Sequence, residues 1–262
     1  MFYIVKKIEY EYLFLNNDYG ILQTVIFMIT SLTNEKIKEY AKLNQAKYRE
    51  EKGLFIVEGP HLVEEAKKAG VLVEVVTTEQ NVVGTLVSEA VMKKISNTVH
   101  PVKVLGICKM INKNEVKSHV LVLDKISDPT NLGTLLRSSV AFGFETVFLS
   151  EGCVDPYNDK VIRGSQGAIF KVNIVKGDLL EFLSKIKKTH QILGTNVRIG
   201  EDVSKVEIKH NWAIILGNEA KGMREEANQF TDSNLYIKMS NTESLNVSVA
   251  GSILMYEISK KC

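Results

Sequence analysis

The second half of the chain alternates short apolar runs with helical patterns, and no other feature restricts its fold as strongly. The apolar, β-rich runs occupy residues 120–123, 146–149, 172–175, 191–193, 212–216 and 235–237. A strand buried on both faces is apolar along its whole length, and parallel strands are joined by crossover helices. We therefore predict an α/β fold here, with a parallel sheet covered by helices on both faces.

The first half has shorter segments. Helices are predicted at 34–43, 61–69 and 88–95, strands at 54–57, 71–76 and 102–104, and a basic turn at 47–52. With 262 residues and 45% hydrophobic content, the chain is long enough for two domains with substantial cores. We predict an N-terminal extension at 1–28, a small α/β domain at 29–106, a polar linker at 107–118 and the sheet domain at 119–262. Met28 is a candidate for the authentic start.

Composition argues against several classes of protein. The formal net charge is only +2, so any affinity for nucleic acid must come from a local basic surface. The three cysteines and five histidines show no metal-ligand spacing, so we expect no metal and a reduced, cytoplasmic setting. The apolar stretch at 21–32 is shorter than the ~20 residues of a membrane helix, and charged residues interrupt any secretory signal. We expect no membrane association.

Polar loops follow three of the predicted strands, at residues 128–133, 217–222 and 240–246. In open parallel sheets, ligands bind beyond the carboxyl ends of the strands. The chain lacks a G-x-G-x-x-G after the first strand of either domain, and the second loop lacks the Gly-Lys-Ser/Thr ending of a phosphate loop. The loops therefore predict a site for a polar ligand against an apolar wall, without support for dinucleotide or triphosphate binding.

Each loop carries a longer motif. The motifs are Asp128-Pro-x-Asn131-x-Gly133-x-x-x-Arg137 with Ala141-Phe-Gly143, then Leu216-Gly-Asn-Glu-Ala-Lys-Gly222, then Ile237-x-Met239 through Glu243-Ser-Leu-Asn-Val-Ser-Val-Ala250. In this order they resemble the SpoU or TrmH-like RNA ribose 2′-O-methyltransferases of the knotted SPOUT class, over residues 119–258. The segment Phe55-Ile-Val-Glu-Gly59 and the following helix resemble the ribosomal-protein-L30e-like substrate-binding domain attached to many members.

The resemblance implies transfer of the methyl group of S-adenosyl-L-methionine to a ribose 2′-hydroxyl of RNA, with ribosomal RNA favoured over transfer RNA. It also implies a homodimer through the catalytic domain and a deep C-terminal trefoil knot. Hydrophobic periodicity alone would not predict the knot, because threaded chains are rare. Two alternatives remain open: a non-catalytic RNA-binding or ribosome-assembly protein of the same fold, and methylation of a base atom by another branch of the class.

The resemblance assigns five catalytic residues: Arg137, Asn131, Glu219, Ser244 and Asn246. Arg137 matches the family's catalytic arginine, which acts on the 2′-hydroxyl with help from a substrate phosphate. A guanidinium is a poor base, so the alternative that Arg137 clamps phosphate and stabilises the developing alkoxide stays open. Asn131 would hold Arg137 or RNA in place, and it is also suited to cap a helix.

The remaining assignments concern the cofactor and the RNA. The expected cofactor-binding residues are Thr195, Asn196, Leu216, Gly217, Gly222, Ile237, Met239 and Leu245. For the apolar members, ordinary core packing is the alternative. The expected RNA-binding residues are Lys47, Arg49, Lys52 and Arg163. Because Glu50 and Glu51 lie among the first three, a solvated surface is the alternative for that cluster.

Overall fold

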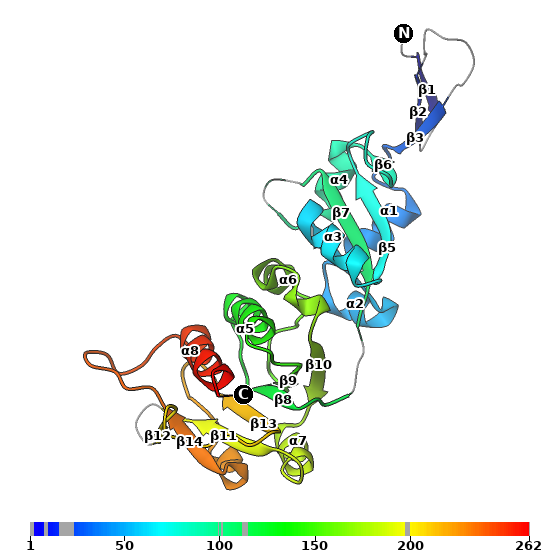
Figure 1. Cartoon of the computed structure of the whole chain (residues 1–262). Helices are drawn as coiled ribbons and strands as arrows, with labels where there is room; N and C mark the ends of the chain where they lie inside the picture. The colour runs from blue at the N-terminus through cyan, green and yellow to red at the C-terminus, as the bar shows by residue number, and fades with distance from the viewer. Residues whose placement is uncertain are drawn as a thin grey trace. The chain divides into compact units, whose positions relative to one another are not determined.

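The computed structural model describes residues 3–7, 10–15, 24–98, 100, 102–111, 115–196 and 200–261, with side chains from Phe27 onward. The chain divides into two compact units, Met1–Met110 and Ile111–Cys262. Each unit has its own sheet, and helices pack against it (Figure 1). The exact domain and linker boundaries given above stay predictions.

The N-terminal unit is built on a mixed seven-stranded sheet with the order β1-β2-β3-β6-β5-β7-β4. Its strands are β1 (Tyr3–Lys7), β2 (Tyr10–Leu15), β3 (Thr24–Ile29), β4 (Leu54–Glu58), β5 (Leu72–Thr77), β6 (Thr85–Val87) and β7 (Val104–Lys109). Its helices are α1 (Glu35–Lys42), α2 (Ala46–Lys52), α3 (Pro60–Lys68) and α4 (Glu89–Ile95). The α/β character predicted for this unit is present.

Several features of this unit differ from the sequence-based expectation, and β6 has no counterpart among the predicted strands. Residues 47–52, expected as a turn, belong to helix α2, which ends at Gly53 in a left-handed conformation with φ +63°. Strand β7 continues three residues into the predicted linker, because Ile107 and Cys108 are fully buried in the sheet. Strand β3 pairs with β6 through Met28 and Ile29, so it crosses the predicted end of the extension.

The C-terminal unit contains a seven-stranded sheet with the order β10-β9-β8-β13-β11-β14-β12, and every neighbouring pair is parallel. The strands are β8 (His119–Leu123), β9 (Thr146–Ser150), β10 (Asn173–Gly177), β11 (Gln191–Thr195), β12 (Glu201–Asp202), β13 (Trp212–Leu216) and β14 (Ser233–Tyr236). All six predicted strands are found, and the two-residue β12 is an addition. The predicted fold class is confirmed.

Alternate residues of the central strands face two separate cores. Leu121 and Leu123 of β8 point into a core with α5 (Pro129–Ala141), α6 (Asp159–Ser165), the 3₁₀ helix η1 (Ala168–Phe170) and α8 (Val247–Ser259). Val120 and Val122 point into a core with α7 (Leu179–Ile186) and the 3₁₀ helix η2 (Glu225–Phe230). This period of two, with both faces covered, explains why the strands are apolar along their whole length.

Helix α8 brings the end of the chain back against α5 and β13. A Cβ atom at Gly251 would lie 2.5 Å from Leu216 Cδ1 and 2.7 Å from Leu135 Cδ2, so a larger residue would require these two side chains to shift. The strand order does not by itself establish the trefoil knot, which stays a prediction. In the part of the chain that the structure describes, none of the helices combines the length and the apolar character needed to cross a bilayer.

Candidate functional site

A cavity of about 360 Å³ opens at the carboxyl ends of β11, β13 and β14. The chain builds β9 and β10 to one side of β8 and then crosses to the other side, so the strand order reverses beside β13. Such reversal points are the usual ligand sites of open parallel sheets. All eight predicted cofactor-binding residues line this cavity: Thr195, Asn196, Leu216, Gly217, Gly222, Ile237, Met239 and Leu245.

The loop after β13 forms one wall of the cavity and is closed on itself. The backbone groups of Asn218 and Gly222 exchange hydrogen bonds of 3.0 and 2.8 Å, and the Asn218 side chain accepts from the backbone N–H groups of Ala220 and Lys221. A Cβ atom at Gly217 would lie 2.0 Å from the backbone nitrogen of Met223. The tight turn therefore requires glycine at its first residue.

Three of the predicted catalytic residues form one hydrogen-bonded group. The Asn131 amide nitrogen donates to Glu219 Oε1 at 3.1 Å, and the Asn246 amide nitrogen donates to Asn131 Oδ1 at 3.0 Å. Asn246 Oδ1 also caps α8 by accepting from the Ser248 and Val249 backbone N–H groups. Asn131, which is buried, thus joins the loops that follow β13 and β14.

The other two predicted catalytic residues, Ser244 and Arg137, are not part of this hydrogen-bonded group. Ser244 lines the cavity, together with Glu219. Arg137 is exposed on α5, outside the residues that line the cavity. Asn131 contacts Glu219 and Asn246 instead of Arg137, and Asp128 caps α5, so the alternative of Asn131 as a helix cap is wrong. Within one chain, Arg137 is therefore not among the residues that line the cavity with Glu219 and Ser244.

The cap of α5 makes the free energy of unfolding of the C-terminal unit depend on pH. The backbone N–H groups of Asn131 and Thr130 donate to the Asp128 carboxylate and hold its pKa below the ordinary value. A carboxyl with a lowered folded-state pKa contributes stability above its unfolded pKa of about 3.9, and this contribution is lost as pH falls through the folded value. We expect Asp128→Ala to lower the free energy of unfolding by about 1 kcal/mol at pH 7.

That difference should shrink as pH falls below about 4. Urea unfolding followed through Trp212, the one tryptophan of the chain, reports on the C-terminal unit in which it is buried. Asp128→Asn keeps a neutral acceptor and should cost less than the alanine variant at pH 7. A difference between wild type and Asp128→Ala that is as large at pH 3 as at pH 7 would contradict this explanation.

The structure changes the set of predicted RNA-binding residues. Arg49 is 5% exposed and donates to the backbone oxygen of Leu43 at 2.9 Å, so its assignment to an RNA-binding surface is wrong. Lys47 and Lys52 are exposed on α2, and Lys52 lies 3.5 Å from Glu39 Oε2. Arg163 forms a 2.8 Å ion pair with Asp159 one helical turn away on α6. RNA contacts by Lys47, Lys52 and Arg163 stay predictions.

Further residues line the cavity without having been predicted. Val247, Ala250 and Leu254 share one face of α8, and their spacing of three and four residues was a usable signal. Asn218 occupies the second position of a polar turn, where asparagine often binds its own backbone. Among the described residues there is no group of three or more histidines, cysteines, aspartates or glutamates placed to hold a metal ion.

The C-terminal unit has a cavity at its topological switch point, with polar side chains from three loops at the rim. This arrangement defines the class of α/β proteins that bind a ligand at the carboxyl ends of parallel strands. Comparison with known proteins identifies the particular family. The SpoU rRNA Methylase family matches residues 118–256, and the MRM3-like substrate binding domain matches residues 34–106. The chain belongs to the SpoU rRNA methylase family, which confirms the predicted resemblance.

Individual relatives agree with this assignment. The chain is 31% identical over 243 residues to the 23S rRNA (guanosine(2553)-2′-O)-methyltransferase RlmP of Bacillus subtilis, a match that covers 88% of this chain and 98% of RlmP. The crystal structure of an RNA 2′-O ribose methyltransferase has 30% identity and a TM-score of 0.76, covering 89% and 98% of the two chains. An AdoMet-bound rRNA methyltransferase from Sinorhizobium meliloti has 24% identity and a TM-score of 0.79, covering 89% and 97%, and shares the fold.

Proposed function

We propose that this protein transfers a methyl group from S-adenosyl-L-methionine to a ribose 2′-hydroxyl of RNA. The observation that carries the proposal is the convergence of Asn131, Glu219 and Asn246 beside a cavity with an apolar wall. A cavity of this size falls within the range of small-molecule sites. Leu216, Ile237 and Leu245 offer apolar surface for an adenine ring, and the polar rim offers partners for a ribose and an amino acid.

The bound cofactor would supply a strongly electrophilic methyl group on a sulfonium, so the protein has little covalent chemistry to perform. Its tasks are to orient a weakly acidic hydroxyl in line with the methyl group and to manage the departing proton. Asn131 fixes the Glu219 carboxylate and the start of α8 relative to each other. Arg137 supplies a fixed positive charge for a substrate phosphate and for the developing alkoxide.

Arg137 reaches this chemistry through a second copy of the chain. Helix α8 exposes three large apolar side chains on one face, Val249, Ile253 and Tyr256, at 48%, 38% and 49%. On the neighbouring helix, Ser138, the residue after Arg137, shares a 2.8 Å hydrogen bond with Ser252 of α8. Exposed apolar patches of this kind are typical of protein–protein interfaces. The proposed homodimer buries this face and brings Arg137 of one copy toward the cavity of the other.

The dimer makes a separate prediction. We expect Ile253→Glu to convert the protein to a monomer, because a buried unpaired carboxylate in the centre of an interface is strongly unfavourable. Sedimentation velocity measures the oligomeric state, and methyl transfer should fall with the dimer fraction. Val83→Glu is a matched control, because Val83 is 93% exposed in the N-terminal unit. A wild-type protein that sediments as a monomer at micromolar concentration contradicts the dimer.

Ribosomal RNA is the favoured substrate, because RlmP, which is matched over 98% of its length, is named as a 23S rRNA 2′-O-methyltransferase. Other relatives are named as tRNA/rRNA methyltransferases, so transfer RNA is the second candidate. The substrate-binding domain would supply RNA contacts, with Lys47 and Lys52 available on α2. A cytoplasmic location fits an enzyme acting on either RNA. Which nucleotide is modified depends on the shape of the RNA.

The test combines cofactor calorimetry with transfer of a labelled methyl group. The wild-type protein should bind S-adenosyl-L-methionine and label ribosomal RNA that was prepared without the modification. Digestion to nucleosides should locate the label on the ribose 2′-oxygen. Absence of cofactor binding would favour a non-catalytic RNA-binding protein, and label on a base would favour another branch of the class. Label in transfer RNA alone would reverse the order of the two substrates.

A further inference from the structure

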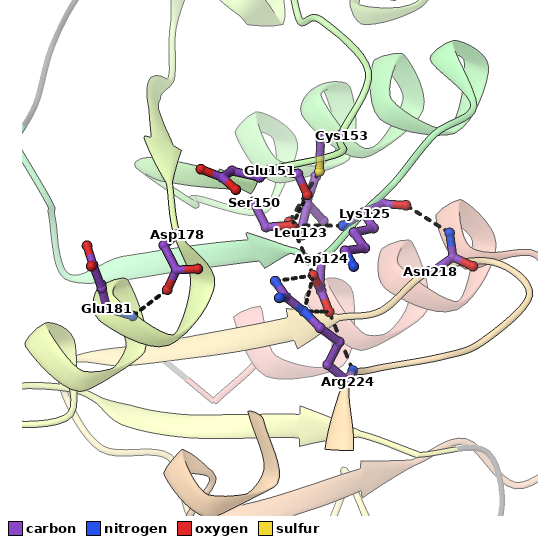
Figure 2. A network of polar contacts seen from close by, with 10 residues as sticks. All are labelled: Leu123, Asp124, Lys125, Ser150, Glu151, Cys153, Asp178, Glu181, Asn218 and Arg224. Carbon is purple, nitrogen blue, oxygen red and sulfur yellow. Dashed lines mark hydrogen bonds and ion pairs between the residues drawn. The ribbon is translucent and has the colours of Figure 1, made fainter. Parts of the chain in front are cut away.

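The buried carboxylate of Asp124 directly follows strand β8. Asp124 is 1% exposed and binds the forked guanidinium of Arg224, with Nε 3.0 Å from both carboxylate oxygens and Nη2 2.8 Å from Oδ1. Ser150 donates to Asp124 Oδ1 at 2.9 Å (Figure 2). Removal of one partner from a buried ion pair is costly, because the remaining charge stays buried without its counter-charge.

Asp124 contacts both ends of the cavity loop, residues 217–223, through its backbone at the start and through its carboxylate at the end. At the start of the loop, the Asp124 backbone N–H donates to the oxygen of Leu216, the last residue of β13, at 2.9 Å. At the end of the loop, Arg224 binds the Asp124 carboxylate through its side chain, and its backbone N–H lies 3.4 Å from Oδ2. The residue directly after β8 thus joins the two ends of a loop that lies about a hundred residues later in the chain.

The next residue adds a third attachment. The Lys125 backbone oxygen accepts from the Asn218 amide nitrogen at 2.9 Å, and its N–H donates to Ser150 Oγ at 3.0 Å (Figure 2). Lys125 has φ +56°, a left-handed conformation that is unfavourable for a residue with a side chain. The surrounding hydrogen bonds keep this conformation in place. The loop itself is closed by its own Asn218–Gly222 bridge, and it is also held by the hydrogen bond from Asn131 to Glu219.

We propose that Asp124 and Arg224 form a positioning pair that holds loop 217–223 in the conformation that binds the cofactor. The inference rests on the proposed function, which assigns the cavity to S-adenosyl-L-methionine. Every residue from Gly217 to Met223 lines that cavity, whereas Asp124 and Arg224 do not line it. The pair therefore acts through the loop, and its loss affects cofactor binding more than the transfer step.

The variants are Arg224→Gln, which removes the charge from a partly exposed side chain, and Arg224→Lys, which keeps one charge without the fork. For Arg224→Gln, we expect the dissociation constant for S-adenosyl-L-methionine to rise about 10- to 100-fold, as expected when one side of a buried pair is lost. The turnover number at saturating cofactor should stay within about twofold of wild type. Arg224→Lys should give an intermediate constant.

Two further measurements separate positioning from general destabilisation. Hydrogen exchange of residues 217–223 in the cofactor-free protein should be faster in Arg224→Gln, while the Trp212 emission of the folded unit is unchanged. Lys187→Gln removes an exposed ion pair to Asp232 and should leave the cofactor constant at the wild-type value. The proposal is overturned by a folded Arg224→Gln protein with wild-type affinity and wild-type loop exchange. Failure of wild type to bind the cofactor refutes the proposed function instead, and loop exchange still tests the pair.

Discussion

Replacing Arg137 by alanine should lower the turnover number for methyl transfer by about 10²–10³-fold, the usual effect of removing one group that stabilises developing negative charge. The dissociation constant for S-adenosyl-L-methionine should change by less than about twofold, because Arg137 does not line the cavity. Arg137 is exposed on α5, so the variant should also fold normally. Steady-state transfer to RNA and calorimetry with the cofactor measure the two effects separately.

The conservative variant Arg137→Lys tests the role of Arg137 as a charged phosphate clamp. Arg137→Lys keeps a positive charge but loses the planar fork that binds phosphate through two hydrogen bonds, so it should recover part of the activity. Lys185→Ala removes an exposed cation from α7, on the other face of the sheet, and should be silent. If Arg137→Ala retained half of the wild-type turnover number, the arginine would have no direct part in the reaction.

The second large effect is expected at Gly217. A Cβ atom there would lie 2.0 Å from the Met223 backbone nitrogen and 2.1 Å from the Gly222 carbonyl carbon, and backbone atoms cannot move aside as a flexible side chain can. Overpacking of this kind costs about 1–3 kcal/mol. Since 1.4 kcal/mol corresponds to a factor of ten, Gly217→Ala should weaken cofactor binding by about 10- to 100-fold. Calorimetry measures the change.

A matched glycine separates this effect from loss of stability. Gly143 follows α5 with φ +78° and has open space where a Cβ atom would lie. Gly143→Ala should therefore cost about 1–2 kcal/mol through backbone strain. Its affinity for the cofactor should equal that of wild type, since Gly143 does not line the cavity. Equal affinities of Gly217→Ala and wild type would exclude the loop as part of the binding site.

The regular part of the fold could be predicted because its signals are local. Strand β13 is apolar along its whole length, and it is buried on both faces as this pattern requires. The carboxyl ends of parallel strands meet at one edge, so the loops after β11, β13 and β14 had to converge. For that reason the predicted residues Thr195, Leu216 and Ile237 line one cavity, although they are far apart in the chain.

Features that depend on tertiary contacts could not be predicted. Arg49 has the sequence context of a surface arginine, and only the packing of α2 buries its guanidinium against Leu43. Asp124 and Arg224 are separated by a hundred residues, and a pattern of hydrophobicity contains no information about such a pair. Charged residues at strand ends are usually solvated, so Asp124 carried no signal that distinguished it from the exposed Lys125.

The most direct test compares the ribose methylation of ribosomal and transfer RNA from cells with and without this protein, and from cells restored with wild type or with Arg137→Ala. We predict that one ribosomal RNA position loses its 2′-O-methyl group, that wild type restores it, and that the arginine variant does not. If every ribose methylation in both RNAs persists without the protein, the account of this chain as an RNA 2′-O-methyltransferase is contradicted.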